Sequence, residues 1–109
     1  MQSLAAIADP TRRRIMELLA VRDRTAGELV EAFELSAPAI SQHLNVLREA
    51  GLVVTRAEGQ TRIQSFNPAG FDDLDAWLQR TRRIWSQRLD ALERELRAED
   101  ARERKRKSS

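Results

Sequence analysis

The stretch that decides the fold is TAGELVEAFELSAPAISQHLNVLREAG, residues 25–51, in which two short helices are joined by a tight turn. Thr25 and Glu28 have the spacing of a capping box, which starts the first helix. Ser36 is a suitable N-cap for the second helix because its hydroxyl can accept a hydrogen bond from an unpaired backbone N–H. Gly51 supplies a left-handed stop at the end. The sequence therefore predicts a supporting helix followed by a second helix with a separate task.

The outward side of this second helix is small, polar and nearly uncharged. Ile40, Leu44 and Leu47 form an apolar stripe at i, i+4 and i+7, which predicts the buried side. Small outward residues let the backbone come close to a ligand, and Ser, Gln and Asn side chains can read base edges in a major groove. This is the helix-turn-helix arrangement, with Gln42 and Asn45 as the best candidates for base readout. The residues expected to line the major groove are Ser36, Ala37, Pro38, Ala39, Ser41, Gln42, His43 and Asn45.

The segment LSAPAISQHLNVLREAGLV, residues 35–53, resembles the recognition helix of the ArsR/SmtB-type winged helix-turn-helix repressors. Their pattern is roughly LS-x-x-x-(I/V)-S-x-HL-x-x-L-x-x-AGLV, and the S-x-HL and AGLV elements are fairly specific. The phrase ADPTRRRIMELL is also similar to the family's first core helix, and the resemblance covers about residues 4–78. It implies a mainly α fold with a small β-hairpin, a dimer, and binding to double-stranded operator DNA.

A hairpin, the wing, is expected after the second helix. Two β-leaning runs, residues 52–55 and 63–66, are joined by a loop around Gly59. Basic residues on both sides of such a loop suit backbone phosphates or a neighbouring minor groove, although ordinary solvated hairpin charges are the alternative. The residues expected to hold DNA phosphates are Arg48, Arg56 and Arg62, with Gln60 as a weaker contact.

A long last helix is expected from about Phe71 to Arg97. Its apolar residues follow a mixed 3/4 spacing over more turns than the core of so small a domain can cover, so we predict a homodimer. In the resembled family the first and last helices form the dimer interface. The part beyond about Trp85 is an extension whose packing the resemblance does not define. The predicted interface residues are Leu4, Ile7, Leu74, Trp77, Leu78, Thr81, Ile84, Trp85, Leu89 and Leu92.

Length and charge predict the division of the chain. We expect residues 1–97 to form one DNA-binding and dimerisation domain. Residues 98–109 carry five basic and three acidic residues and no apolar stripe, which predicts a frayed helix end or a disordered tail. That tail is either a solvated terminus or a source of nonspecific attraction to phosphate. The Arg12–Arg14 run has similar alternatives: a solvated face, phosphate contacts, or pairing at the dimer interface.

Many members of the resembled family sense metals, but the residues that bind those metals are missing from this sequence. The positions that match the family's Cys-x-Cys pair are Thr25 and Gly27, the chain has no cysteine, and the last helix has no histidine. We therefore expect no metal and no cofactor. His43, the single histidine, is open to a packing role, a DNA contact or metal ligation. DNA release would be controlled by the amount of protein, or by an organic ligand that binds near Trp77 and Trp85. The alternative role of these two tryptophans is packing in the core of the dimer interface.

The sequence thus predicts a metal-independent repressor that binds a pseudo-palindromic operator as a homodimer in the cytoplasm. No apolar run approaches the ~18 residues of a membrane span, and no nucleophilic cysteine, second histidine or glycine-rich phosphate loop suggests an enzyme. Half-sites should lie roughly 34–36 Å apart, or a multiple of that. The alternative is a winged helix used for protein contact. The absence of large apolar groups on the outward face of residues 38–45 disfavours it.

Overall fold

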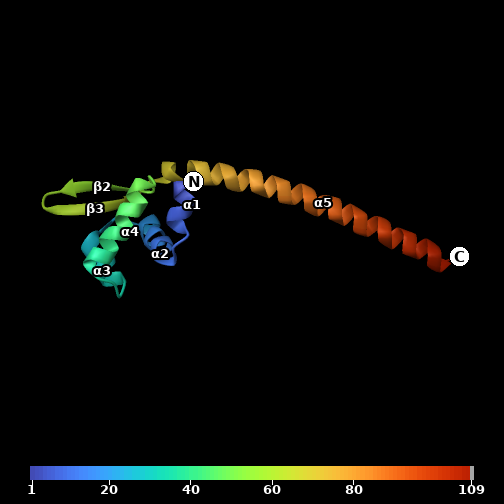
Figure 1. Ribbon diagram of the computed structural model, residues 1–109, viewed down its shortest axis with the longest axis horizontal. Coiled ribbons are helices and arrows are strands. Elements are labelled where there is room, and N and C mark those ends of the chain that lie inside the picture. Colours follow the sequence, from blue (N-terminus) through green and yellow to red (C-terminus); the bar gives the residue numbers. More distant parts are fainter. Residues whose placement is uncertain (109) are drawn as a thin grey trace. The chain divides into compact units, whose positions relative to one another are not determined.

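The computed structural model describes residues 1–108 and is mainly helical, with one small antiparallel sheet (Figure 1). The elements in chain order are α1 (Gln2–Ile7), α2 (Pro10–Val21), β1 (Arg24–Thr25), α3 (Ala26–Ala32), α4 (Ala37–Glu49), β2 (Val53–Glu58), β3 (Thr61–Phe66), the 3-10 turn η1 (Pro68–Phe71) and α5 (Asp72–Ser108). Residues 1–75 form one compact unit, and α5 from Ala76 onward forms a second. The predicted fold class, a helix-turn-helix with a wing and a long last helix, is confirmed.

The helices begin where local hydrogen bonds satisfy their first backbone N–H groups. The Asp9 carboxylate accepts from two such groups at the start of α2. At α3, Thr25 and Glu28 form the predicted capping box, each side chain accepting from the other residue's backbone N–H across 3.1 Å. At α4, the Ser36 hydroxyl accepts from the N–H of Ala39 across 3.3 Å. These short-range caps fix the start of every helix that the helix-turn-helix needs.

The sheet has three strands in the order β1-β3-β2, where the sequence predicted only the β2–β3 hairpin. The hairpin register runs from Val53 opposite Phe66 to Glu58 opposite Thr61. Its turn contains Gly59, which has a φ of 60° that other residues rarely adopt. The additional strand β1 is only two residues long and leads directly into α3. Its shortness explains why no sequence pattern indicated it.

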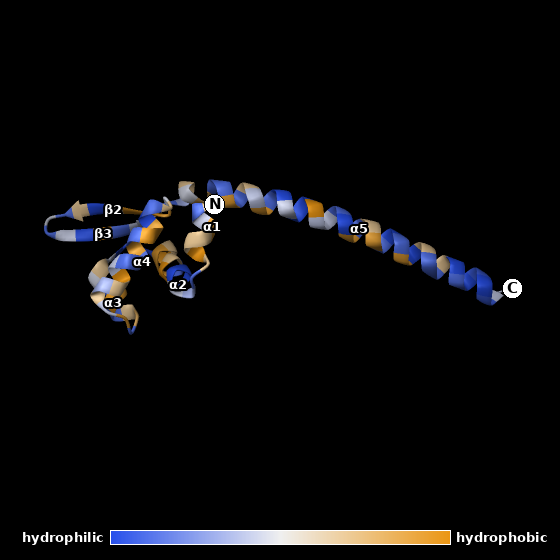
Figure 2. Ribbon diagram, in the orientation of Figure 1, coloured by the Kyte–Doolittle hydropathy of each residue, from blue (hydrophilic) through white to orange (hydrophobic). Residues whose placement is uncertain are grey.

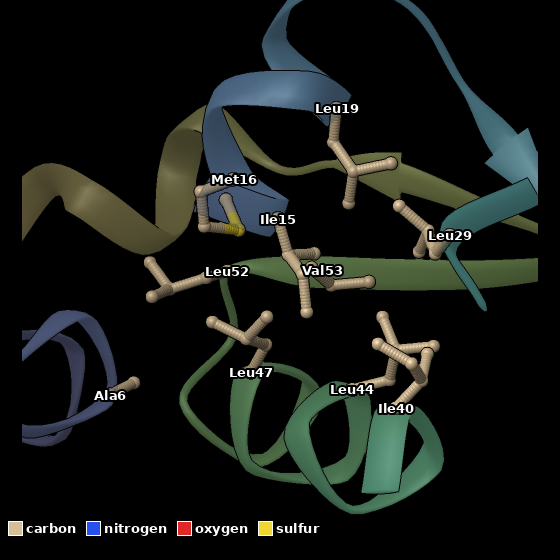
Figure 3. Close-up of a cluster of buried hydrophobic side chains, with 10 residues drawn as sticks. All are labelled: Ala6, Ile15, Met16, Leu19, Leu29, Ile40, Leu44, Leu47, Leu52 and Val53. Atoms are coloured by element: carbon tan, nitrogen blue, oxygen red, sulfur yellow. The ribbon is translucent and has the colours of Figure 1, made fainter. Parts of the chain in front are cut away.

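The core lies between α4, α2, α3 and the sheet. The stripe predicted for α4 is buried, and Figure 3 shows Ile40, Leu44 and Leu47 pointing toward the side chains of the other elements. Because the stripe is held on one side, the opposite side of α4 is fixed facing outward. The remaining buried cluster consists of Ala6, Ile15, Met16, Leu19, Leu29, Leu52 and Val53.

The junction between α4 and the start of α5 is tightly packed. Gly51 ends α4 with a φ of 78°, and its carbonyl oxygen accepts a hydrogen bond from the Asn67 side chain across 2.8 Å. A Cβ atom at Gly70 would lie 2.1 Å from that same oxygen, so no larger residue fits there. The turn η1 is therefore held against the end of α4.

Helix α5 continues to Ser108, past the end that the sequence predicted near Arg97. Residues 98–109 were expected to form a frayed helix end or a disordered tail, and the structure describes a helix as far as Ser108. Ala, Glu, Arg and Lys are strong helix formers, and the exposed pairs Arg97–Glu93 and Arg102–Glu99 add support at i,i+4 and i,i+3 spacing. Figure 2 shows hydrophobic bands that recur along α5 and give way to a hydrophilic end. The compact unit ends at Asp75, earlier than the predicted domain boundary.

Candidate nucleic-acid interface

The outward side of α4 is free within the described chain to meet another molecule. Ala39 and His43 are half-buried, and the other side chains predicted to face the groove are exposed. This exposed side begins at the N-terminus of α4, where unpaired N–H groups and the helix dipole favour a negatively charged ligand. The exposed predicted residues are Ser36, Ala37, Pro38, Ser41, Gln42 and Asn45.

His43 packs between α4 and α2. Its Nδ1 atom lies 3.4 Å from the Nη1 atom of Arg12. The same guanidinium donates from Nε to the carbonyl oxygen of Ala6 across 2.5 Å and from Nη2 to that of Ala5 across 3.4 Å. This geometry supports a packing role for His43.

The Arg12–Arg14 run is divided among separate local contacts. Arg12 and Arg13 both bind backbone oxygens near the end of α1, and Arg13 reaches those of Ile7 and Ala8 at 3.1 and 3.3 Å. Cations suit a helix C-terminus because the last carbonyls are unpaired. Arg14 forms an exposed ion pair with Glu17 at 3.0 Å. The first two arginines therefore hold α1 to α2, a role that the sequence analysis did not consider.

A polar network joins α4 to the hairpin. Arg48 donates from Nη1 to the Thr55 hydroxyl and to the Gln64 carboxamide oxygen, both at 3.2 Å. The Thr55 hydroxyl also donates to that oxygen, across 2.7 Å. From its other terminal nitrogen, Arg48 donates to the carboxamide oxygen of Asn45. The structure thus connects a residue predicted to read bases with one predicted to hold phosphates.

Gln64 is the residue of this network that the sequence analysis missed. Its side chain is only 2% exposed, which is unusual for a glutamine. The alternation of side chains between the two faces of β3 could have indicated this burial, because Gln64 is two residues from Phe66 and therefore shares its face. Burial of the carboxamide is tolerated because its oxygen accepts from both Arg48 and Thr55.

The two wing arginines lie on opposite faces of the hairpin. Arg62 pairs with Ala57, two positions from the Thr55–Gln64 pair, so it shares the face on which the polar network lies. On that face an open groove between α4 and the hairpin is lined by Arg48, Thr55, Ala57 and Arg62. Arg62 and Arg48 therefore flank one concave surface beside the exposed side of α4.

Arg56 faces the other way and is engaged by acidic and polar groups. Its guanidinium donates to the Asp23 carboxylate and to the Ser65 hydroxyl, each across 2.8 Å, and lies 3.7 Å from Glu58. The hydrogen bond from Arg56 lowers the pKa of Asp23, and the same bond raises the pKa of Arg56. In this geometry Arg56 holds the segment before β1 to the hairpin. Gln60 lies exposed in the hairpin turn.

The positions that would match the family's cysteine ligands have other roles. The Thr25 hydroxyl is used in the α3 cap, and Gly27 has no side chain. Over residues 1–108, no group of three or more His, Cys, Asp or Glu side chains is arranged to hold a metal ion. In the same range, no helix combines the length and apolar character needed to cross a membrane.

Comparison with known proteins places these features in a family. Residues 9–55 match the model of the bacterial regulatory proteins of the arsR family. The HTH-type transcriptional regulator Rv2034 of Mycobacterium tuberculosis is 40% identical over 90 residues, which cover 79% of this chain and 84% of that protein. The chain belongs to the ArsR family. Like its relatives, this ArsR-family chain is a DNA-binding transcription regulator and not an enzyme.

Other ArsR-type proteins support the same assignment. The transcriptional repressor SdpR of Bacillus subtilis is 42% identical over 73 residues, covering 67% of this chain and 81% of SdpR. The solved structure of an ArsR-like transcriptional regulator from Rhodococcus sp. RHA1 has a TM-score of 0.70 and 31% identity, over 84% of this chain and 86% of that one. The match therefore extends over most of the compact unit and into α5.

The predicted interface residues of this ArsR-family chain differ in how accessible they are. Leu74 is only 5% exposed, and Ile7 is partly buried and packs against the core. The two residues face inward because α1 and the first turn of α5 belong to the compact unit. Leu4 remains 41% exposed, and Thr81 is half-buried. The exposed large apolar side chains of α5 are Trp77, Leu78, Ile84, Trp85, Leu89, Leu92 and Leu96.

Proposed function

We propose that this ArsR-family regulator is a metal-independent repressor that binds a pseudo-palindromic operator as a homodimer. The observation that carries the proposal is the exposed side of α4, which is small and polar and is flanked by the groove containing Arg48 and Arg62. A major groove accepts such a helix, while the adjoining phosphates attract the two guanidinium groups. The relative SdpR is a transcriptional repressor, which supports repression as the direction of regulation.

Base readout is assigned to Gln42 and Asn45. Gln42 is exposed on α4, and its amide can pair bidentately with adenine. The Asn45 oxygen accepts from Arg48, so its NH₂ group is oriented to donate to a base acceptor. The remaining exposed residues of the predicted groove-lining set would allow close approach of the backbone.

Phosphate contact is assigned to Arg62 and Arg48, with Gln60 at the turn as a weaker contact. Both arginines border the groove beside α4. Arg56 is not included because it faces the other side of the hairpin and is paired with Asp23. Of the two wing arginines predicted to contact phosphate, the proposal therefore keeps only the one on the face beside α4.

Dimerisation is assigned to the exposed apolar side chains of α5, with Leu4 contributing from α1. Side chains such as Trp85 and Leu89, 59% and 60% exposed, would leave water on pairing with a second copy. A two-fold dimer presents two reading helices to two half-sites, so the operator should be an inverted repeat. Residues 1–75 would then act as the DNA-binding part and α5 from Ala76 as the dimerisation part.

Metal independence is supported by the residues at the family's ligand positions, Thr25 and Gly27. DNA release would follow from the amount of protein, or from an organic effector near Trp77 and Trp85. We place the regulator in the cytoplasm, where operator DNA is accessible. A screen of small molecules by tryptophan fluorescence separates the two modes of release, because an effector at these indoles would quench or shift the emission.

The test is selection of bound duplexes from a random DNA pool, repeated with EDTA and with added zinc. Enrichment of an inverted repeat that is unaffected by either addition would support the proposal. Enrichment only with zinc would contradict metal independence. If no sequence were enriched and binding vanished at physiological salt, the winged-helix protein-interaction module would become the better explanation.

A further inference from the structure

The side chains of Asn45 and Arg48, which lie about one turn apart on α4, are joined by a hydrogen bond. The Nη2 atom of Arg48 donates to the carboxamide oxygen of Asn45. A guanidinium group has donors and no acceptor, so the Asn45 atom that faces it must be the oxygen. The NH₂ group of Asn45 therefore lies on the other side of the carboxamide, and the orientation of this amide is fixed by the chemistry of its neighbour.

Arg48 is itself held in place from the hairpin. Its Nη1 atom donates to the Thr55 hydroxyl and to the Gln64 carboxamide oxygen, each across 3.2 Å. Thr55 and Gln64 are opposite one another in the hairpin register, and the Thr55 hydroxyl donates to the same Gln64 oxygen across 2.7 Å. Gln64 is only 2% exposed, so this anchor lies inside the protein. The guanidinium is thus tied to the sheet on one side and reaches Asn45 on the other.

We propose that Asn45 reads guanine, and that Thr55 and Gln64 are positioning residues that act on this choice through Arg48. The inference rests on the DNA-binding function proposed above and names the base that one of its two readers selects. An asparagine whose amide is unoccupied pairs bidentately with adenine, because its oxygen accepts from the N6 amino group while its NH₂ group donates to N7. In this chain the oxygen already accepts from a cation.

The charge of Arg48 distinguishes among the bases. The N6 amino group of adenine would have to approach the Asn45 oxygen beside the guanidinium, where a second donor is repelled by the positive charge. Guanine presents two acceptors in the major groove, O6 and N7, and no donor. The NH₂ group of Asn45 can donate to these acceptors while the guanidinium charge attracts them. Thymine offers a single acceptor beside a methyl group and cytosine offers a donor, so guanine fits best.

This role is compatible with the phosphate contact assigned to Arg48. Its Nη1 and Nη2 atoms make the three hydrogen bonds described above, whereas its Nε atom makes none within residues 1–108. The side chain also borders the open groove beside the hairpin. One guanidinium can therefore orient Asn45 and still donate to a phosphate.

The test begins with selection from a random DNA pool by the wild type and by Asn45→Ala. The base pair whose preference disappears in Asn45→Ala is the pair that Asn45 reads. The proposal predicts that this pair is G·C in the duplexes enriched by the wild type. Replacing its guanine by adenine should raise the dissociation constant of the wild type by about tenfold.

Arg48→Met tests whether the guanidinium sets this choice. The substitution keeps a long side chain but removes the donor to Asn45, so the freed oxygen can accept from adenine. The preferred pair should therefore change from G·C to A·T at that position alone, and a merely structural role of Arg48 would not produce such a change. The matched control is Arg62→Met, which removes a charge from the same groove but leaves the Arg48–Asn45 hydrogen bond in place. It should weaken binding and retain guanine.

Thr55→Val tests the positioning role and needs no change in Arg48. It replaces the hydroxyl by a methyl group of similar size, so Arg48 loses one of its two anchors on the hairpin. The preference for guanine over adenine should fall at the pair read by Asn45 and at no other pair. Thr61→Val, at an exposed position of the same hairpin, is the control and should keep the wild-type preference. This pair of variants also tests the proposal if Arg48→Met does not fold.

Several outcomes would overturn the inference and leave the proposed function standing. These are an inverted repeat with A·T at the pair read by Asn45, no pair affected by Asn45→Ala, and retention of guanine by Arg48→Met. A change of preference in Arg62→Met would also overturn it, because the effect would then follow from charge in general. If the wild type enriched no sequence, the proposed DNA-binding function would fail together with the inference.

Discussion

Arg48 of α4 donates to the carboxamide oxygen of Gln64 in β3 across 3.2 Å, and this bond joins the proposed reading helix to the middle of the hairpin. The same oxygen accepts from Thr55, so one buried atom organises both side chains. Arg48 in turn holds Asn45. The orientation of a residue on the proposed DNA-facing side is thus linked to a side chain inside the protein.

Gln64→Met should destabilise the fold by about 1–3 kcal/mol, because it removes a buried acceptor while keeping the side chain's size. Urea unfolding measures the loss. Gln60→Met, at an exposed position in the hairpin turn, is the matched control and should stay within about 0.5 kcal/mol of the wild type. Equal stability of both variants would show that the network adds nothing to the fold.

Gln42→Ala and Arg62→Ala should weaken DNA binding in different ways. Loss of the Gln42 amide should relax sequence preference at one base pair, at a cost of about 1–3 kcal/mol. Loss of Arg62 should weaken binding to all duplexes and reduce the salt slope by about one. Binding titrations over a range of salt distinguish the two effects, and wild-type behaviour of both variants would refute the assigned interface.

Arg56→Ala should leave DNA affinity and its salt slope unchanged, because Arg56 is paired with Asp23 on the far face of the hairpin. A slope reduced as in Arg62→Ala would mean that Arg56 contacts phosphate after all.

The same substitution should change how stability depends on pH. The hydrogen bond from Arg56 lowers the pKa of Asp23 in the folded state, so its stabilising effect is present above the ordinary value of 3.8. It is lost as pH falls through the lowered pKa. Between about pH 6 and pH 2, the wild type should therefore lose more stability than Arg56→Ala. The Asp23 carboxyl of the variant, followed by NMR, should titrate closer to 3.8; identical titration curves would contradict the pairing.

Asp9→Ala should lower stability by about 1 kcal/mol, since the carboxylate accepts from the N–H groups of Thr11 and Arg12 at the start of α2. Asp9→Asn keeps an oxygen acceptor and should retain most of that stability. Thermal unfolding of the two variants compares them directly. If Asn cost as much as Ala, charge rather than capping would explain the contribution of Asp9.

Short-range signals in the sequence predicted the centre of this fold. Thr25, Ser36 and the stripe ending at Leu47 act within a few residues of their own position, so pattern and spacing were enough to place them. The β-leaning runs on either side of Gly59 predicted the wing, and the 3/4 spacing of apolar residues predicted the long last helix; the family resemblance agreed with both. The outward side of α4 followed from the buried stripe, since a helix that buries one side exposes the other.

Features that depend on register or on distant partners were not predictable in this way. Arg56 and Arg62 look equivalent beside the same loop, yet the hairpin register places them on opposite faces. Asp23 meets Arg56 only because β1 joins the sheet. Gln64 became a core residue because Arg48 and Thr55 reach it from two other elements. The position of the end of α5 could not be read from the pattern, because a charged segment can be helical without an apolar stripe.

Gly70 leaves no room for even a methyl group against the carbonyl of Gly51, and this makes the connection behind the reading helix a rigid joint. A rigid joint transmits displacement. A molecule that displaced η1 would press on the residues that follow α4, because Gly70 lies directly against the backbone of Gly51 and Leu52. The strength of DNA binding could then be altered from a site that never touches the nucleic acid, with this glycine as the mechanical link.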